Sequence, residues 1–289
     1  MDLIGVLGLG LIFGIFVSGM IVSFRFLGFA DLTIEGSFTL GGVIFAVSIN
    51  QESGILFATG LSIFGGGLAG LLTGILHCYV GINKLLSGIT TLTMLYTINL
   101  RILGKSNLFI ENTTLLNFIK IENYELYCLL GISTIIYITL YRFFSTNFGL
   151  FLRATGENES FIKNIRVNSK VFIIIGLMIS NSLIALSGSL FSQYVGYSDI
   201  GNGNGMLVSM LTAMIIGENI IRPTAVKRQL FAAFVGAIVF QFLYSLALQV
   251  GVNPIDLKII IGILLILFFI ITKYSNRDKV KKNIGTDFL

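Results

Sequence analysis

Long, uninterrupted apolar segments determine what this chain can fold into. A stretch of about 17–25 apolar residues is needed for a helix to cross a bilayer, and seven of the nine segments approach that length. The segments are continuous and do not alternate with polar residues, which favours helical spans over the strands of a barrel. The nine segments are Leu3–Val22, Gly36–Ile49, Gly54–Val80, Leu85–Leu103, Tyr124–Tyr141, Val171–Val195, Met206–Ile221, Leu230–Val250 and Leu257–Thr272.

The composition agrees with a membrane protein. Of the 289 residues, 55% are hydrophobic and 11% are charged, whereas a soluble domain has about 25% charged residues. The mean hydropathy is +0.91. We therefore expect one all-α domain over residues 1–289, a polytopic membrane helical bundle of eight to nine spans.

The basic residues lie in the gaps between the apolar segments, so the net charge of +5 does not indicate nucleic-acid binding. If the N-terminus is outside, 15 of the 19 basic residues fall on the inner side. Lys and Arg concentrate on the cytoplasmic side of membrane proteins. We therefore expect an outside N-terminus and a cytoplasmic C-terminus, with residues 274–289 as a tail. The four basic residues on the outer side are Arg101, Lys105, Lys120 and Lys258.

Two apolar segments, Gly36–Ile49 and Met206–Ile221, are short for a span and occupy corresponding places in the order. Each follows a long span and a polar, glycine-containing loop. We therefore expect an inverted repeat with halves at 1–104 and 171–273, in which both short helices are broken spans. Residues 105–170 would supply a connecting span and a cytoplasmic loop. Paired short segments in two such halves indicate a transport pathway near the membrane midplane.

Polar residues gather just before both short segments, in FADLTIEGSFTLGG and in GYSDIGNGNG. Irregular backbone at membrane depth occurs only where it is buried in protein or lines a water-filled cavity. We expect the two polar stretches to mark broken helices beside a cavity within the membrane. The alternative is that both are ordinary loops at the membrane surface. Threonines on one face of the fourth span add candidates, although their hydroxyls can also bond back to their own helix. The candidate pathway residues are Asp31, Thr33, Glu35, Ser37, Thr93, Thr97, Asp199, Asn202 and Asn204.

The sequence contains no motif for enzyme chemistry. The patterns HExxH, GxSxG and CxxC are absent, and the two cysteines and one histidine form no metal-binding set. A P-loop that ended at Lys105 would need a glycine where Asn99 stands. We therefore expect no enzyme activity, no metal and no cofactor.

The long loop Arg142–Lys170 carries five basic residues and is expected in the cytoplasm. Its segment Glu157–Arg166 is predicted to form a short helix, with Gly156 allowing the backbone to turn into it. Phe161 is the one aromatic residue of that segment, and an exposed aromatic residue usually marks a contact. Arg153 can brace the loop through its fork of donors. We expect a docking surface for a cytoplasmic partner; a solvated loop held near anionic membrane lipid is the alternative.

Three stretches resemble the permease subunits of bacterial ATP-binding-cassette (ABC) importers. They are FLGFADLTIEGSFTLGG, FLRATGENESFIKNIRVN and SNSLIALSGSLFSQYVGYSDIGNGNGMLVSMLTAMIIGE. The resemblance is to the branch with branched-chain amino acid and ribose permeases, and is closest to the single-permease group proposed for amino acids, including aromatic ones. The chain departs from this family at Arg166, where relatives often have a glycine.

The resemblance implies a set of partners and a function. The coupling-loop helix would seat in a groove of a separate ATPase subunit, two permease copies would surround a central pathway, and an extracytoplasmic binding protein would deliver the substrate. The chain would then be an importer permease in the bacterial cytoplasmic (inner) membrane for a small polar solute, with an amino acid favoured. The implied ATPase-coupling residues are Arg153, Gly156, Glu157, Asn158, Phe161 and Lys163.

Two other functions remain open from the residues alone. An ion- or proton-coupled secondary transporter would use carboxylates such as Asp31, Glu35, Asp199 or Glu218 to bind the ion. A membrane scaffold without transport activity is the second alternative, and the polar residues near the short segments argue against it. Neighbouring genes for an ATPase and a binding protein would favour the importer.

The predicted orientation can be tested by labelling single cysteines from either side of the membrane. In a background that lacks Cys78 and Cys128, a cysteine at position 158 should react only from the cytoplasm. A cysteine at position 112 should react only from outside. Labelling of both positions from the same face would contradict the predicted crossing pattern.

Overall fold

The computed structural model describes residues 3–112, 114–116, 124–164, 166–253, 256–267 and 270. The expected cytoplasmic tail, residues 274–289, lies outside this part of the chain. The helices and strands are α1 (Leu3–Met20), η1 (Ile21–Phe26), α2 (Thr33–Asn50), α3 (Ile55–Cys78), α4 (Lys84–Leu103), β1 (Asn107–Phe109), α5 (Tyr124–Phe144), α6 (Asn147–Glu157), α7 (Glu159–Asn164), α8 (Ser169–Val195), β2 (Tyr197–Asp199), α9 (Met206–Ile221) and α10 (Val226–Gln249).

The described part of the chain contains five helices that are long and apolar enough to cross a membrane. This confirms the prediction of a multi-pass helical membrane protein, while the count of eight to nine spans remains a prediction. Three apolar helices are shorter, and they include most of α2, the whole of α9 and a C-terminal helix, Leu257–Leu267. The five long spans are Leu3–Phe26, Ile55–Cys78, Tyr124–Phe144, Ser169–Val195 and Val226–Gln249.

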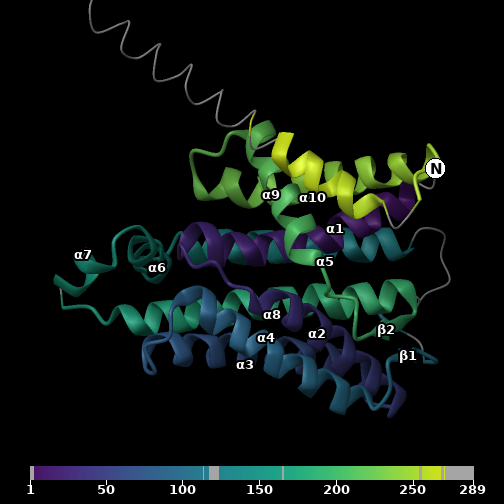
Figure 1. Ribbon diagram of the computed structural model, residues 1–289, viewed down its shortest axis with the longest axis horizontal. Helices are drawn as coiled ribbons and strands as arrows, with labels where there is room; N and C mark the ends of the chain where they lie inside the picture. The colour runs from purple at the N-terminus through teal and green to yellow at the C-terminus, as the bar shows by residue number, and fades with distance from the viewer. Residues whose placement is uncertain are drawn as a thin grey trace, which may run out of the picture.

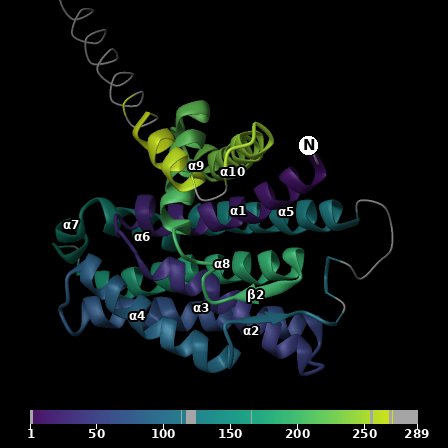
Figure 2. The same cartoon turned by 45° about the vertical axis from the view of Figure 1, so that its right-hand side comes forward.

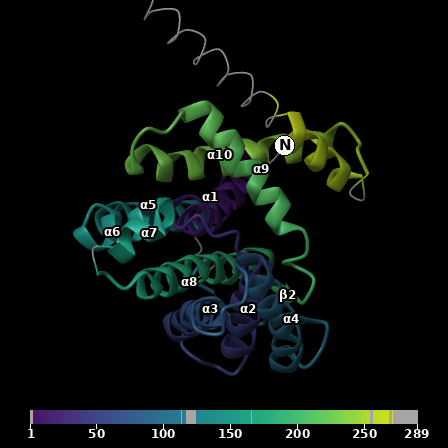
Figure 3. The ribbon, with the colours of Figure 1, turned by 60° about the vertical axis from the view of Figure 1, so that its left-hand side comes forward.

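The helices form layers that share a long axis (Figures 1 and 2). Helices α2, α3, α4 and α8 lie together, α1 and α5 lie next to them, and α10 lies beyond α1. The elements α6 and α7 occupy one end of the bundle, and β1, β2 and the N-terminus occupy the other. Helix α9 crosses from the neighbourhood of β2 past α1 to the layer of α10, as Figure 3 shows.

Glycines allow α2 to pack directly on the backbone of α8. A Cβ atom at Gly41 would lie 1.9 Å from the carbonyl oxygen of Ala185, and one at Gly188 would lie 1.9 Å from that of Phe38. Small residues let membrane helices approach this closely, so that many backbone atoms come into contact. The short helix α2 is thereby fixed along the central and C-terminal part of α8.

Two short strands are an addition to the expected all-α fold. Strand β1 pairs antiparallel with β2, with Asn107 opposite Asp199. The pairing continues beyond the strands, because the backbone N–H of Ile110 donates to the carbonyl of Gly196 at 2.9 Å. The side chain of Asn50, the last residue of α2, donates to the carbonyl of Phe109 at 2.7 Å. The segment after α4 is therefore joined to the loop after α8 and to the end of α2.

The predicted helix Glu157–Arg166 is wrong in its extent. The structure has a longer helix, α6, that begins at Asn147, and a separate helix α7 at Glu159–Asn164. Gly156 lies in the last turn of α6 and does not turn the chain into a new helix. Asn158 does that: its side-chain oxygen accepts the backbone N–H of Phe161 at 3.0 Å, which is the geometry of a helix N-cap.

Packing of α2 on α8 can be tested with two alanine substitutions. Gly41→Ala should lower the free energy of unfolding by about 1–3 kcal/mol, the usual cost of overpacking, because the added methyl group meets the backbone of Ala185. Gly60→Ala in α3 is the matched control, since a Cβ atom there meets nothing within 4 Å. Thermal unfolding of the purified proteins in detergent is the measurement. Equal unfolding temperatures would contradict this packing.

Candidate functional site

The chain re-enters the bundle between η1 and α2. Helix α1 is followed by the π-helical turn η1. A short linker, residues 27–32, then reverses the direction of the chain and leads to α2. The backbone N–H of Phe29 donates to the carbonyl of Ser23 at 2.8 Å, which closes this turn. The linker brings Asp31 to Asn181, which lies near the centre of α8. Helix α2 therefore begins halfway along the bundle.

Asp31 lies in a buried polar network at the start of α2. One carboxylate oxygen accepts the backbone N–H of Thr33 at 2.9 Å, and the other accepts the side-chain amide of Asn181 at 2.7 Å. Ser37 donates its hydroxyl to the amide oxygen of Asn181 at 2.6 Å. All four residues are buried. Buried polar groups need such partners because an unpaired one is costly, so the network fixes α2 against α8.

A row of threonine hydroxyls joins the start of α2 to its other neighbours. The hydroxyl oxygens of Thr33 and Thr73 lie 2.7 Å apart, and Thr73 donates to Thr91 at 3.0 Å. These three residues belong to α2, α3 and α4 and are fully buried. The start of α2 is therefore bonded to three surrounding helices, with α8 as the third.

Glu35 connects α2 to the second short helix. Its carboxylate accepts the backbone N–H groups of Gly205 and Leu207, each at 3.1 Å. These donors belong to the N-terminus of α9, where backbone N–H groups have no partner within the helix. Gly205, the residue that precedes α9, has no side chain to cap it. A carboxylate at a helix N-terminus also interacts favourably with the helix dipole.

The loop before α9 passes close to α2 at a glycine. A Cβ atom at Gly203 would lie 2.2 Å from the carbonyl oxygen of Glu35. In the sequence the two polar loops are far apart and occupy equivalent places in the two predicted halves. The structure brings them together: GYSDIGNGNG ends against the residues that begin α2.

The two short helices start at the same place and leave it in opposite directions. Helix α2 runs to the end of the bundle that contains β1, where Asn50 bonds to Phe109. Helix α9 runs toward the other end, where Glu218 pairs with Arg25. Broken helices that meet inside a bundle in this way are typical of transport pathways with inverted repeats. The boundaries of the two halves, at 104 and 171, remain predictions.

An ion pair closes the far end of α9. Arg25 in η1 donates to both carboxylate oxygens of Glu218, at 2.7 and 2.5 Å. The arginine side chain is 44% exposed and the glutamate 18% exposed. Such a forked pair has a defined geometry, and it ties the end of the first span to α9.

The remaining predicted pathway residues do not join this network. Asp199 accepts the backbone N–H of Gly201 at 2.6 Å and so stabilises its own turn. Asn202 is half-buried and Asn204 is exposed, both in the loop before α9. Thr93 and Thr97 are exposed on the face of α4 that points away from the bundle. A pathway role for these residues remains a prediction.

Two residues of the network could not be assigned from the sequence. Asn181 lies in the middle of the apolar segment Val171–Val195, and it bridges Asp31 and Ser37. Thr73 lies in the apolar segment Gly54–Val80 and is bonded to Thr33 and Thr91. A polar residue in the middle of an apolar span is the one signal that could have identified them.

The residues of the loop that was expected in the cytoplasm form a compact unit next to the linker of residues 27–32. A Cβ atom at Gly156 would lie 2.0 Å from the carbonyl oxygen of Phe26, so α6 packs directly on the end of η1. Arg153 donates to the carbonyl of Phe144 at 3.5 Å. Phe161 is 56% exposed, and Glu157 and Asn158 are also exposed. The side chain of Lys163 lies outside the described part of the chain.

No group of three or more metal-ligating side chains occurs within the described residues. Apolar helices of membrane length define a multi-pass membrane protein, in which two short helices meet at a polar centre. A family model, the branched-chain amino acid transport system permease component, matches residues 3–270. The chain belongs to this family.

Curated relatives extend over nearly the same length. The chain is 38% identical to a "Tyrosine transport system permease protein" of Clostridioides difficile (strain R20291), over 92% of this chain and 90% of the relative. It is 34% identical to an uncharacterized protein, RP368, of Rickettsia prowazekii (strain Madrid E), over 91% of this chain and 94% of the relative. No solved structure matches the chain significantly.

The contact between α2 and α9 can be tested at Glu35. Glu35→Ala removes the acceptor of two N–H groups and should lower the free energy of unfolding by about 1 kcal/mol, the usual cost of losing a helix cap. Glu35→Gln keeps an acceptor oxygen but removes the charge, so its effect should be smaller. Thermal unfolding in detergent measures both. Glu52→Ala, at an exposed glutamate beyond the end of α2, is the control, and a Glu35→Ala protein as stable as this control would contradict the capping role.

Proposed function

We propose that this protein is the membrane subunit of an ATP-driven importer and forms the pathway for an amino acid. In this proposal an extracytoplasmic binding protein delivers the solute, two permease copies surround the pathway, and separate ATPase subunits bind in the cytoplasm. The protein would lie in the bacterial inner membrane, with its N-terminus outside and its C-terminus in the cytoplasm. Membership of the permease family and the likeness to a tyrosine transport permease support this proposal.

The observation that carries the proposal is the contact between α6 and the re-entrant linker. Leu27 lies between two glycines, Gly156 of α6 and Gly176 of α8. Four residues further on, Asp31 is bonded to Asn181 at the start of α2. A movement of α6 therefore has a short, tightly packed route to the centre of the bundle.

The same route suggests how ATP would drive transport. Closure of the ATPases on ATP would displace the unit formed by α6 and α7, and the linker would transmit this displacement to the start of α2. Because Glu35 also holds the start of α9, both short helices would move together. Rigid elements that rock about a fixed site are the usual basis of alternating access.

The carboxylates give little support to an ion-coupled transporter. Asp31 and Glu35 accept hydrogen bonds from the protein itself, and Asp199 accepts one within its own turn. Glu218 pairs with Arg25. All four carboxylates thus have hydrogen-bond or ion-pair partners within the protein. The permease family also argues against a scaffold without transport activity.

Docking of the ATPase can be tested at Phe161. Phe161→Ala should weaken the complex by about 1–2 kcal/mol or more, as truncation of an interfacial aromatic residue does. The permease should still reach the membrane, because α7 lies at the end of the bundle. The measurement is the amount of ATPase that copurifies with equal amounts of permease, together with solute uptake.

Phe109→Ala provides the matched control, because Phe109 is also an exposed aromatic residue but lies at the opposite end of the bundle, in β1. It should leave ATPase binding unchanged. If Phe161→Ala retains as much ATPase and as much uptake as Phe109→Ala, α7 is not the docking element, and the proposed importer function loses its main structural support.

A further inference from the structure

A groove lies between two helices of membrane length, α5 and α10. Its volume is about 320 Å³, and Leu11 of α1, which is buried, forms part of its floor. Leu130 and Phe231 line it and are exposed, so the groove opens sideways, toward the space that a bilayer fills around the bundle. Apart from Ser133, Thr134 and Tyr137, its lining is apolar.

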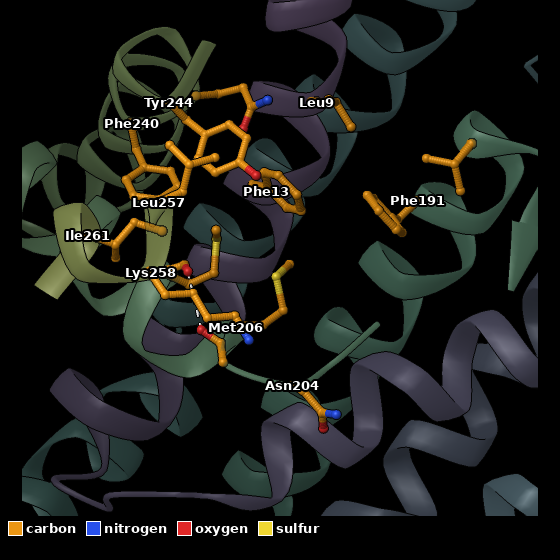
Figure 4. Close-up of a pocket in the computed structure, with 15 residues that line it drawn as sticks. Leu9, Phe13, Phe191, Asn204, Met206, Phe240, Tyr244, Leu257, Lys258 and Ile261 are labelled. Carbon is orange, nitrogen blue, oxygen red and sulfur yellow. Dashed lines mark hydrogen bonds between the residues drawn. The ribbon is translucent and has the colours of Figure 1, made fainter. Parts of the chain in front are cut away.

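Helix α10 has an unfilled space on each of two sides. One is this groove, and the other is a cavity of about 380 Å³ to which α10 contributes Phe240 and Tyr244 (Figure 4). Helix α10 also packs directly on α9, because a Cβ atom at Gly236 would lie 2.1 Å from the carbonyl oxygen of Ala213. A molecule that fills the groove would therefore brace the helix that supports α9.

The groove contains a buried hydroxyl group without a partner. Ser133 is 5% exposed, and its Oγ makes no hydrogen bond in the described part of the chain. A buried polar group without a partner is costly. An occupant that suits this groove therefore needs an acceptor at the depth of Ser133, in addition to apolar surface.

Basic residues gather at one end of the groove. The hydroxyl of Tyr137 donates to the backbone carbonyl of Lys227 at 3.3 Å, which joins α5 to the first turn of α10. Lys227 and Arg228 are exposed in that turn, and Arg142 is exposed in the last turn of α5. The distribution of basic residues predicts that this end lies on the inner side of the membrane, where anionic lipids attract Lys and Arg.

The start of α10 also offers backbone N–H groups to an anion. Its N-cap residue, Ala225, has no side-chain acceptor for them, and the first N–H groups of a helix have no partner within the helix. The segments 126–156 and 219–252 contain no Asp or Glu that could neutralise the nearby cations. Phosphate groups bind at helix N-termini for these reasons, and basic pockets between membrane helices bind anionic lipid headgroups.

We infer that this groove binds an anionic glycerophospholipid of the inner leaflet. Its phosphate lies at the start of α10, beside Lys227 and Arg228, and one acyl chain fills the groove. Ser133 lies one helical turn, about 6 Å, deeper than Tyr137, so its hydroxyl can donate to the ester carbonyl that follows the phosphate in such a lipid. The bound lipid joins α5 to α10 and does not depend on the proposed importer function.

Lipid binding to the full-length permease, purified in detergent, tests the inference. Native mass spectrometry counts the lipids that remain bound, and a titration gives their affinities. One phosphatidylglycerol should bind about tenfold more tightly than phosphatidylethanolamine, because its net negative charge meets two cations. Inorganic phosphate should not displace it, since phosphate has no acyl chain to fill the groove.

Removal of the two cations should weaken this binding. Lys227→Gln combined with Arg228→Gln should lower the affinity for phosphatidylglycerol about tenfold or more. The matched control combines Arg101→Gln with Lys105→Gln, which removes the same charge from exposed positions at the end of α4 and just beyond it. The control should bind phosphatidylglycerol as the unchanged protein does.

Two further variants test the groove itself. Ser133→Ala should lower the affinity about fivefold, the effect of one lost hydrogen bond, without lowering the unfolding temperature of the lipid-free protein, because the hydroxyl has no partner there. Thr134→Trp places a large ring in the groove from an exposed position and should abolish tight binding. A Ser133→Ala protein that is less stable without lipid but binds it normally would show that the hydroxyl has a structural role only, and would overturn the assigned contact.

Three other results would overturn the inference as a whole. Equal affinities for the two lipids would mean that the groove holds any acyl chain. Displacement by inorganic phosphate would mean that the start of α10 binds a free anion. A lipid-free dimer that Thr134→Trp splits into monomers would mean that a second copy of the chain covers the groove.

Discussion

The structure depends on bringing two helix N-termini together, one buried at the start of α2 and one partly exposed at the start of α9. Each N-terminus carries unpaired N–H groups and a partial positive charge, so the two are unfavourable side by side without acceptors. Asp31 accepts an N–H at the start of α2, and Glu35 accepts two at the start of α9. This explains why so apolar a chain places two carboxylates four residues apart: each one stabilises the beginning of a different short helix.

Uncharged side chains and close backbone contacts hold the meeting point of α2 and α9 in place. Asn181 holds Asp31 from the middle of α8, and the threonine row holds α2 to α3 and α4. Glycines bring the helix backbones within contact distance, as at Gly41 and Gly188. Hydrogen bonds and close backbone contact drive helix association in a membrane, where the hydrophobic effect contributes little between helices.

The sequence predicted best those features that depend on one helix alone, such as the bounds of the short helices. The bounds of α9, Met206–Ile221, agree with the predicted apolar segment, and α2 begins three residues before its predicted start because Thr33 and Glu35 are helical as well as polar. Helix α6 was missed because Gly149 and Gly156 look like loop residues, although both make close backbone contacts. The partner of Glu35 is 170 residues away, and no local pattern could identify it. The pairing of β1 with β2 was missed for the same reason, since three-residue strands leave almost no trace in a sequence.

The two ends of the bundle are closed by different kinds of interaction. At one end, β1 and β2 are joined by backbone hydrogen bonds, which have fixed lengths and leave the paired segments little freedom. At the other end, the partly exposed pair of Arg25 and Glu218 can separate and re-form in water at small cost. The end that contains α6 and α7 can therefore loosen at less cost than the end that contains β1 and β2. An opening of the bundle, as the proposed transport cycle requires, would begin at the ion pair of Arg25 and Glu218 and leave the sheet intact.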